Sequence, residues 1–146
     1  MVENQFDFDS LNWSEAKTAR KFECGSPNML GIHALNCSIK LILQRKIEFI
    51  EDLLVKNSRY IAKKLETVPE TTVQSDTDAL RISGIVSFRH NRIPSEALYN
   101  ELMLNNVICA MRNGNVRFSP HYYTSKKVID GAIEVLKKII ASGSQN

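Results

Sequence analysis

The segment Asn106–Ser119 reads NVICAMRNGNVRFS, and it decides the fold that we predict for this chain of 146 residues. Two β-prone runs flank the dipeptide Asn113-Gly114. An Asn-Gly pair in that setting is the strongest short signal of a β-hairpin, because both central residues of a type I′ turn need a positive φ. The sequence therefore predicts an antiparallel pair of strands here, within a small and mostly antiparallel sheet.

Further strands and helices are predicted on both sides of the hairpin. Arg81–Arg89 reads as a strand, and Thr71–Gln74 reads as a shorter one. Pro94 opens a short helix, and Thr124 is the expected N-cap of a final helix. The apolar positions expected on the buried faces are Ile82, Val86, Phe88, Leu98, Leu102, Val128, Ala132, Val135 or Leu136, and Ile139.

A long helical pattern precedes these strands. From Pro27 to about Thr67, apolar residues recur at spacings of three, four or seven, which marks one face of a helix. Pro27 or Asn28 is the expected start, and Pro69 ends the pattern. Because about forty residues is long for one helix of a globular protein, we expect a break around Gln44–Lys46.

The order of these elements describes an α+β fold, in which a small, mostly antiparallel sheet is covered on one side by helices. Residues 27–141 are expected to form this domain, and residues 142–146 a disordered tail. Residues 1–26 read as an irregular lead-in with four large apolar side chains, which either pack on this domain or cover a surface that lies elsewhere. These side chains are Phe6, Phe8, Leu11 and Trp13.

Composition excludes several classes of function. The net charge of +3, from 19 basic and 16 acidic residues, is small, and the lysine pairs fall at polar positions of helical patterns, so we expect no nucleic-acid binding. No apolar stretch approaches the roughly twenty residues that cross a bilayer, so no membrane contact is expected. The three cysteines, without a secretory leader, indicate reduced thiols in the cytoplasm. No Cys/His spacing matches a metal site.

Two segments could carry chemistry. Lys21–Asn28 (KFECGSPN) places Gly25 and Ser26 before a helix start, where N–H groups and the helix dipole favour an anion. Ser26 could instead simply cap that helix. In Arg112–Tyr123 (RNGNVRFSPHYY), Arg117 is suited to binding a carboxylate through two parallel hydrogen bonds. The alternative is that it pairs with a structural Asp or Glu.

Together with the strand Gly84–Phe88 (GIVSF), these segments resemble motifs of the class V aminotransferase family of pyridoxal-phosphate-dependent enzymes. Members carry an Arg-Phe-Glu-x-Gly-Thr-Pro-Asn segment, which here reads KFECGSPN, and an Arg-x-Ser-x-His-x-Tyr-Asn segment, which here reads RFSPHYYT. The resemblance runs from about residue 18 to about residue 140. It implies the C-terminal domain of a fold-type I pyridoxal-phosphate-dependent transferase, similar to cysteine desulfurases, selenocysteine lyases and isopenicillin N epimerase-like proteins.

The resemblance also implies roles for single residues. Arg117 matches the arginine that binds the α-carboxylate, so an amino-acid substrate is expected. Gly25 and Ser26 match the segment that binds the phosphate of the neighbouring subunit's pyridoxal phosphate, which implies a homodimer. Ser26 stands where the family has threonine, and it keeps the hydroxyl group. His121 and Tyr122 match positions that support the Arg117 segment.

The family's Schiff-base lysine and its acidic partner of the pyridinium nitrogen lie in a large domain upstream of these motifs. Only twenty-four residues precede Gly25 here, and Lys17 among them lacks a strand-turn context, so no catalytic residue is expected in this chain. We predict a C-terminal fragment of an aminotransferase or lyase, inactive by itself, whose lead-in contacts the missing large domain. The alternative is a free-standing α+β binding or regulatory domain without catalysis.

The cysteines bear on the type of reaction. Cysteine desulfurases place a nucleophilic cysteine on a mobile loop before the Arg-x-Ser segment, but here a tight turn follows Arg112 directly. Cys109 lies inside a predicted strand, where a thiol is usually inert, and Cys24 is expected to be a small buried filler. Desulfurase chemistry is therefore disfavoured, whereas transamination, elimination and racemisation stay open.

Overall fold

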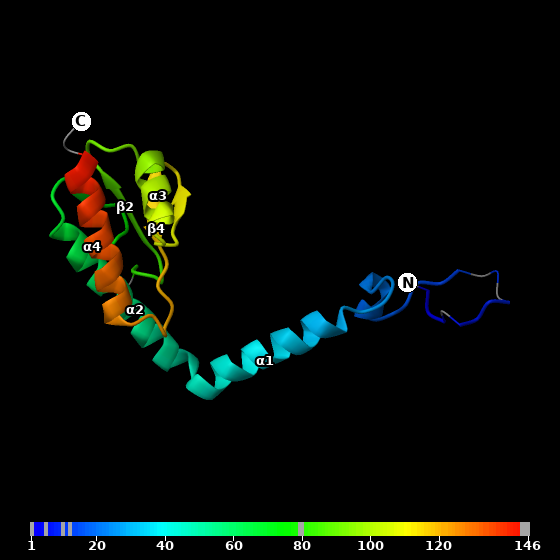
Figure 1. Ribbon diagram of the computed structural model, residues 1–146. Helices are drawn as coiled ribbons and strands as arrows, with labels where there is room; N and C mark the ends of the chain where they lie inside the picture. Colours follow the sequence, from blue (N-terminus) through cyan, green and yellow to red (C-terminus); the bar gives the residue numbers. More distant parts are fainter. Residues whose placement is uncertain (1, 5, 10, 12, 79–80, 144–146) are drawn as a thin grey trace. The chain divides into compact units, whose positions relative to one another are not determined.

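The computed structural model describes residues 2–4, 6–9, 11, 13–78 and 81–143 (Figure 1). The chain forms two compact units, Met1–Gln44 and Arg45–Asn146. The predicted helix break is confirmed near this boundary, because α1 (Met29–Arg45) and α2 (Ile47–Glu66) are separated by one residue. Lys46 between them has a φ of 65° and a ψ of 133°, a backbone conformation far from that of an α-helix.

The first unit buries very little of its surface. Besides α1 it contains the short 3-10 helix η1 (Ala19–Phe22) and one isolated bridge between Val2 and Glu15. Among the described residues of this unit only Ala16 is buried, and α1 buries none of its own. The four apolar side chains of the lead-in are 73% to 101% exposed. They therefore do not pack on the described part of their own unit.

The second unit is built on a four-stranded antiparallel sheet with the strand order β1-β2-β4-β3. The predicted hairpin is confirmed, because β3 pairs with β4 and the turn residues Asn113 and Gly114 have φ values of 50° and 71°. Positive φ at both positions is what a type I′ turn requires. The strands are β1 (Thr71–Val73), β2 (Val86–His90), β3 (Ala110–Arg112) and β4 (Asn115–Phe118).

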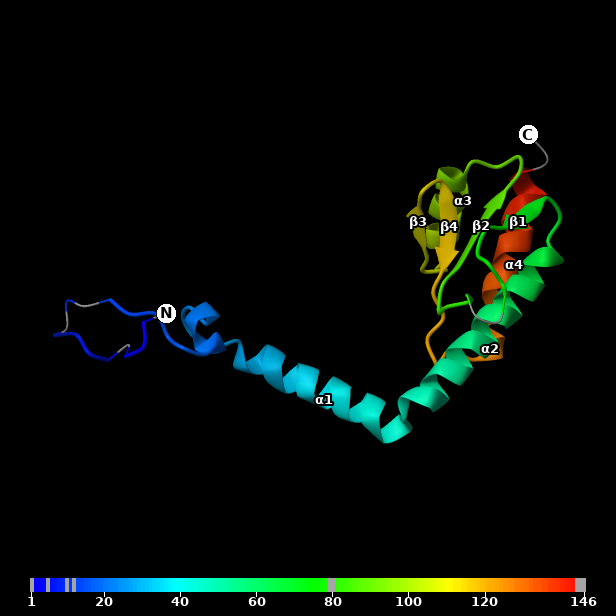
Figure 2. The same ribbon diagram turned by 180° about the vertical axis from the view of Figure 1, so that it is seen from behind.

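Three helices, α2, α3 (Ser95–Leu104) and α4 (Lys126–Gly143), lie on the same face of this sheet, as two opposite views show (Figures 1 and 2). The predicted α+β fold, with helices covering one side of a small antiparallel sheet, is thus confirmed. Leu98 and Leu102 of α3 are fully buried, as predicted. The core further contains Leu65, Val86, Phe88, Val116, Phe118, Ile133 and Leu136.

The strand predicted at Arg81–Arg89 is shorter than expected. It begins only at Val86, because the segment before it forms a turn. In that turn the backbone N–H groups of Arg81 and Ile82 both donate to the carbonyl oxygen of Asp78, at 3.0 Å. Arg81 and Ile82 therefore use these donors locally, and they do not extend the ladder of β2.

The strand predicted from Asn106 is also shorter, and it begins at Ala110. Residues 105–107 instead terminate α3. Val107 N–H donates to the carbonyl of Leu102 at 2.9 Å, Asn106 N–H donates to that of Met103 at 3.1 Å, and Asn106 has a φ of 60°. This pair of bonds around a left-handed residue is the Schellman motif, which satisfies the last carbonyl groups of a helix.

The final helix differs from the prediction in its cap and in part of its buried face, whereas Leu136 and Ile139 are buried as predicted. Thr124 is not the cap: the hydroxyl of Ser125 accepts from Val128 N–H at 3.4 Å, whereas the Thr124 hydroxyl accepts from His121 N–H. Val128 is 62% exposed, and Ile129 lies in the core instead. Val128, Ala132 and Val135 line an open hollow of about 550 Å³ beside Val107 and Ile108. The core residues of α4 are Ile129, Ile133, Leu136, Ile139 and Ile140.

Candidate functional site

Arg117 lies in the middle of the sheet, on the face that the helices leave open. Its neighbours on β4, Val116 and Phe118, are buried in the core on the helical side. Since successive side chains of a strand point to opposite faces, Arg117 belongs to the open side. Its Nε is buried without a hydrogen-bond partner. Among the residues that the structure describes, no carboxylate forms an ion pair with the Arg117 guanidinium. The alternative of a structural Arg–carboxylate pair is therefore not observed there.

Two further arginines share the open face with Arg117. The register pairs Ser87 with Arg117, and it pairs Thr72 with Arg89. Arg112 pairs with Asn115, two residues before Arg117 on β4. The described strands β1 to β4 contain no Asp or Glu at all. The open face therefore carries positive charge that the sheet itself does not neutralise.

The segment that follows Arg117 is held by Asn57 of α2, a residue that sequence reasoning missed. The Asn57 amide donates to the carbonyl oxygens of His121, at 3.2 Å, and of Thr124, at 3.0 Å. Asn57 is only 9% exposed. A signal was present in the sequence, because Asn57 falls on the apolar stripe of its helix, between Ile50 and Ile61, where a polar residue needs a partner.

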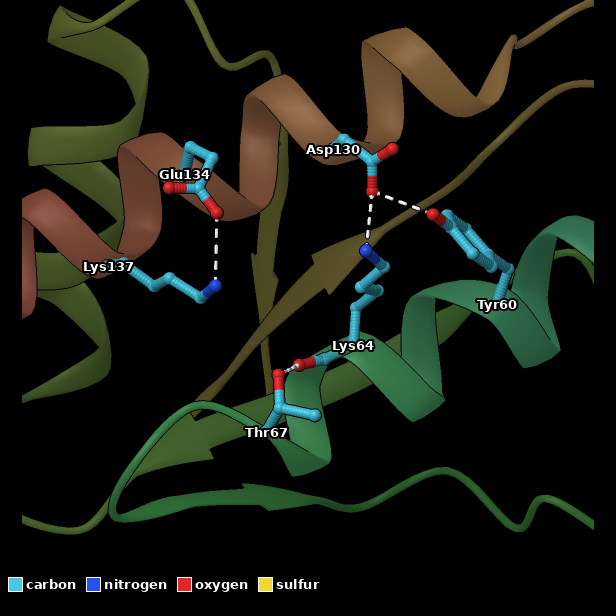
Figure 3. A network of polar contacts seen from close by, with 6 residues as sticks. All are labelled: Tyr60, Lys64, Thr67, Asp130, Glu134 and Lys137. Atoms are coloured by element: carbon cyan, nitrogen blue, oxygen red, sulfur yellow. Dashed lines mark hydrogen bonds and ion pairs between the residues drawn. The ribbon is translucent and has the colours of Figure 1, made fainter.

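A polar network joins α2 to α4 (Figure 3). The Tyr60 hydroxyl donates to Asp130 at 2.8 Å, and Lys64 Nζ lies 3.0 Å from the same carboxylate oxygen. The hydrogen bond from Lys64, and then that from Tyr60, lowers the pKa of Asp130. The bond to Asp130 likewise raises the pKa of Lys64. The network is a link between two helices on the side of the sheet opposite Arg117.

The glycine-hydroxyl segment belongs to the first unit. Gly25 has a φ of 78°, which favours glycine, although a Cβ there would meet nothing within 4 Å. The cap of α1 is Asn28, whose side-chain oxygen accepts from Gly31 N–H at 2.9 Å. Ser26 is exposed and is not that cap. Its hydroxyl makes no hydrogen bond with the described residues.

Comparison with known proteins identifies the family. The family model described as aminotransferase class-V matches residues 3–128, which is most of the chain. The chain belongs to the class V aminotransferase family. The predicted resemblance of the chain to this family is thus confirmed.

Two curated relatives support this membership of the class V aminotransferase family. A probable cysteine desulfurase of Borreliella burgdorferi is 28% identical over 149 residues, covering 90% of this chain and 35% of the relative. The uncharacterized aminotransferase YcbU of Bacillus subtilis is 28% identical over 120 residues, covering 82% and 31%. The chain thus spans about a third of the length of the curated relatives that it matches.

Solved structures agree on the fold. The apo structure of a cysteine desulfurase from Thermococcus onnurineus NA1 superposes with a TM-score of 0.80 at 20% identity, covering 97% of this chain and 38% of that one. The cysteine desulfurase CsdA from Escherichia coli gives a TM-score of 0.76 at 15% identity, covering 97% and 37%. Similarity at this level of identity is evidence for the fold alone.

The surroundings of two cysteines and of Lys17 bear on the chemistry expected from the class V aminotransferase family. Cys109 precedes β3 and is partly buried, and this burial raises the pKa of its thiol. A raised pKa lowers the thiolate fraction, and the thiolate is the reactive form. Cys24 is exposed, so its prediction as a buried filler is wrong. Lys17 lies 3.4 Å from Glu3, with 83% of its side chain exposed.

The described residues show neither a metal-binding cluster nor a membrane-spanning helix. No group of three or more His, Cys, Asp or Glu side chains is arranged to hold a metal ion in the part of the chain that the structure describes. Among the helices of that part, none has the length and apolar character needed to cross a membrane.

Proposed function

We propose that this chain is the C-terminal part of a pyridoxal-phosphate-dependent aminotransferase or lyase, in which Arg117 binds the α-carboxylate of an amino acid. The observation that carries the proposal is the state of Arg117: a half-buried guanidinium on an open sheet face, without a carboxylate partner among the described residues. A partly buried cation without a counter-charge is costly. A substrate carboxylate would supply that charge through two parallel hydrogen bonds.

The residues near α1 fit the phosphate of the cofactor. Ser26 offers an exposed hydroxyl without a partner among the described residues, and Gly25 before it adopts a left-handed backbone. Both would bind the phosphate of pyridoxal phosphate held by a neighbouring subunit, in a cytoplasmic homodimer. When bound, the cofactor serves as an electron sink for the substrate's α-carbon. The Schiff-base lysine of this chemistry is expected outside the chain, in a large domain.

This assignment also accounts for the exposed first unit. The lead-in and α1 present apolar side chains, among them Leu30 at 82% and Leu43 at 71% exposure. Exposed apolar surface of this extent is typical of a face that contacts another protein part. We infer that the missing large domain covers this face, as the share of the relatives' length outside the match suggests.

Translation of the coding DNA upstream of the Met1 codon tests the proposal. We expect an open reading frame that continues through a large domain with a lysine in a strand-turn context. A stop codon directly upstream, in frame and without such a domain, contradicts the proposal. It would favour the free-standing binding domain.

The isolated chain offers a second test. Incubation with one equivalent of pyridoxal phosphate, reduction with borohydride and peptide mapping should show no lysine labelled preferentially over the surface lysines. Lys127 and Lys138, both exposed on α4, are the internal references for surface reactivity. Selective labelling of a single lysine such as Lys17, at several times the level of these references, would contradict an inactive fragment.

A further inference from the structure

Three arginines lie on three neighbouring strands of the open sheet face. Arg89 is on β2, Arg117 on β4 and Arg112 on β3. Phe88 pairs with Val116, so the antiparallel register continues with Arg89 opposite Asn115. Asn115 in turn pairs with Arg112. Arg89 and Arg112 therefore flank Asn115 in one cross-strand row, and Arg117 lies one row away on the same face.

The register puts the three side chains within reach of one small ligand. Diagonal neighbours on adjacent strands are about 7–8 Å apart, a distance that long side chains span. This spacing applies to Arg117 with Arg89 and to Arg117 with Arg112. Arg89 and Arg112 are two strands apart, or about 10 Å. The arginines thus form a triangle with Arg117 at one corner.

We propose that this triangle binds an amino acid with a second anionic group at the end of its side chain. Arg117 binds the α-carboxylate, and Arg89 and Arg112 bind the side-chain anion. The inference rests on the proposed role of Arg117 and adds a substrate class to it. A neutral side chain would leave two guanidinium groups of the face without a counter-charge.

Charge on the described residues supports this assignment. Two other arginines of the second unit pair with acids, Arg81 with Asp76 and Arg92 with Glu70. Arg89, Arg112 and Arg117 make no ion pair with any residue in the described ranges. Guanidinium groups suit this purpose because their planar fork matches a carboxylate, which the ammonium group of lysine does not.

The turn Asn113-Gly114 holds Arg112 in this arrangement. Both turn residues have positive φ, as the two-residue type I′ turn demands. Asn115 lies between Arg89 and Arg112 in the cross-strand row. Its side-chain amide donates a hydrogen bond to the Asn113 carbonyl oxygen at 3.0 Å. The Ser95 hydroxyl of α3 donates to the Gly114 carbonyl at 2.7 Å. The hairpin therefore sets the backbone position of Arg112 at the edge of the open face.

Binding to the ¹⁵N-labelled chain, followed by NMR at about 10 mM ionic strength, tests the inference, since the Debye length is then about 30 Å. The probes are L-glutamate against L-glutamine and L-aspartate against L-asparagine, pairs of equal size of which only the acid carries a side-chain charge. We expect the acid to bind about tenfold more tightly than its amide in at least one pair. Arg112→Gln and Arg89→Gln should each reduce this ratio to about twofold, and Arg117→Gln should weaken both members of the pair.

The control variant is Arg59→Gln, an exposed arginine of α2 that removes the same charge elsewhere. It should leave the acid-to-amide ratio unchanged, and an equal loss in this variant would overturn the inference in favour of overall charge. Equal binding of acid and amide, both lost in Arg117→Gln, overturns the second-anion site but leaves the proposed function intact. Binding that Arg117→Gln does not weaken contradicts both.

Discussion

The helices α1 and α2 follow each other in the chain and share the same apolar spacing, but they differ completely in burial. α1 buries none of its residues, whereas α2 buries a face against the sheet and α4. Exposed apolar surface costs about 25 cal/mol per Å² relative to burial. Apolar spacing thus predicts that a helix needs a partner surface, but it does not say where that surface is. The buried residues of α2 are Ile50, Asn57, Ser58, Ile61, Ala62 and Leu65.

The largest expected effect comes from the same substitution made in each helix. Leu65→Ala in α2 removes a fully buried side chain and should lower the free energy of unfolding by about 2–5 kcal/mol. Leu35→Ala in α1, where the side chain is 61% exposed, should change it by less than about 0.5 kcal/mol. Urea denaturation followed by the Tyr and Trp signals measures both. Similar losses for the two variants would mean that α1 is packed within this chain.

A smaller loss of stability is expected when either of two hydrogen-bonding asparagines, Asn57 of α2 or Asn28 at the start of α1, is replaced. Asn57→Ala removes two hydrogen bonds from a buried side chain and should cost about 1–3 kcal/mol. Asn28→Ala removes the cap of α1. It should lower the helical circular dichroism of the first unit without changing the unfolding midpoint of the second.

The Asn57 substitution has a further readout. The N–H exchange of Thr124 and of the residues after Arg117 should accelerate in Asn57→Ala, because their tether to α2 is lost. Unchanged exchange there would show that Asn57 does not position the segment. Asn57→Asp, which keeps the size but not the donors, should resemble Asn57→Ala in this measurement.

The smallest effect concerns pH. The pKa of Asp130 lies below its usual 3.8 in the folded chain, so its contribution to stability is complete above 3.8 and is lost as pH falls through the lowered value. Lys64 has a pKa raised above 10.5, so its contribution is complete below 10.5 and is lost as pH rises further. Asp130→Asn should therefore melt a few degrees below the wild type between these limits, and the two melting curves should converge in acid.

In α1, by contrast, we expect the helical signal not to depend on pH in the acid range. The described α1 contains no Asp or Glu, so its helical signal should not change as carboxylates titrate. A gap between wild type and Asp130→Asn that persists at pH 2 would show that the network acts through packing rather than charge. Exposure of both side chains keeps the expected effect small.

Much of the fold follows from local patterns in the sequence. The Asn113-Gly114 turn needs only its own two residues to be recognised, and the break near Lys46 follows from helix length. The buried face of α4 could not be chosen by the same means. Val128 and Ile129 are both apolar and adjacent, so two overlapping stripes fit the periodicity. Packing against α2 and α3 selects Ile129.

The site was predictable only in part, because its arrangement depends on strand register. Arg117 stood out through its motif, and its place on the open sheet face agrees with the proposed role. Its grouping with Arg89 required knowing that β2 lies beside β4 rather than beside β3. Ser26 could not be separated from a helix cap until the structure placed Asn28 in that position.

The two-residue turn between β3 and β4 also governs which length changes this hairpin can tolerate. Side chains alternate between faces with a period of two, so one residue added to the turn would shift the register and turn the strand over. Arg112 would then move to the helical side, and Met111, its neighbour, to the open side. A longer loop at Asn113 would keep Arg112 on the open face only if the inserted residues left the original strand register unchanged. An insertion that changes this register should therefore remove Arg112 from the open face, whereas Arg89 on β2 and Arg117 on β4 should stay there.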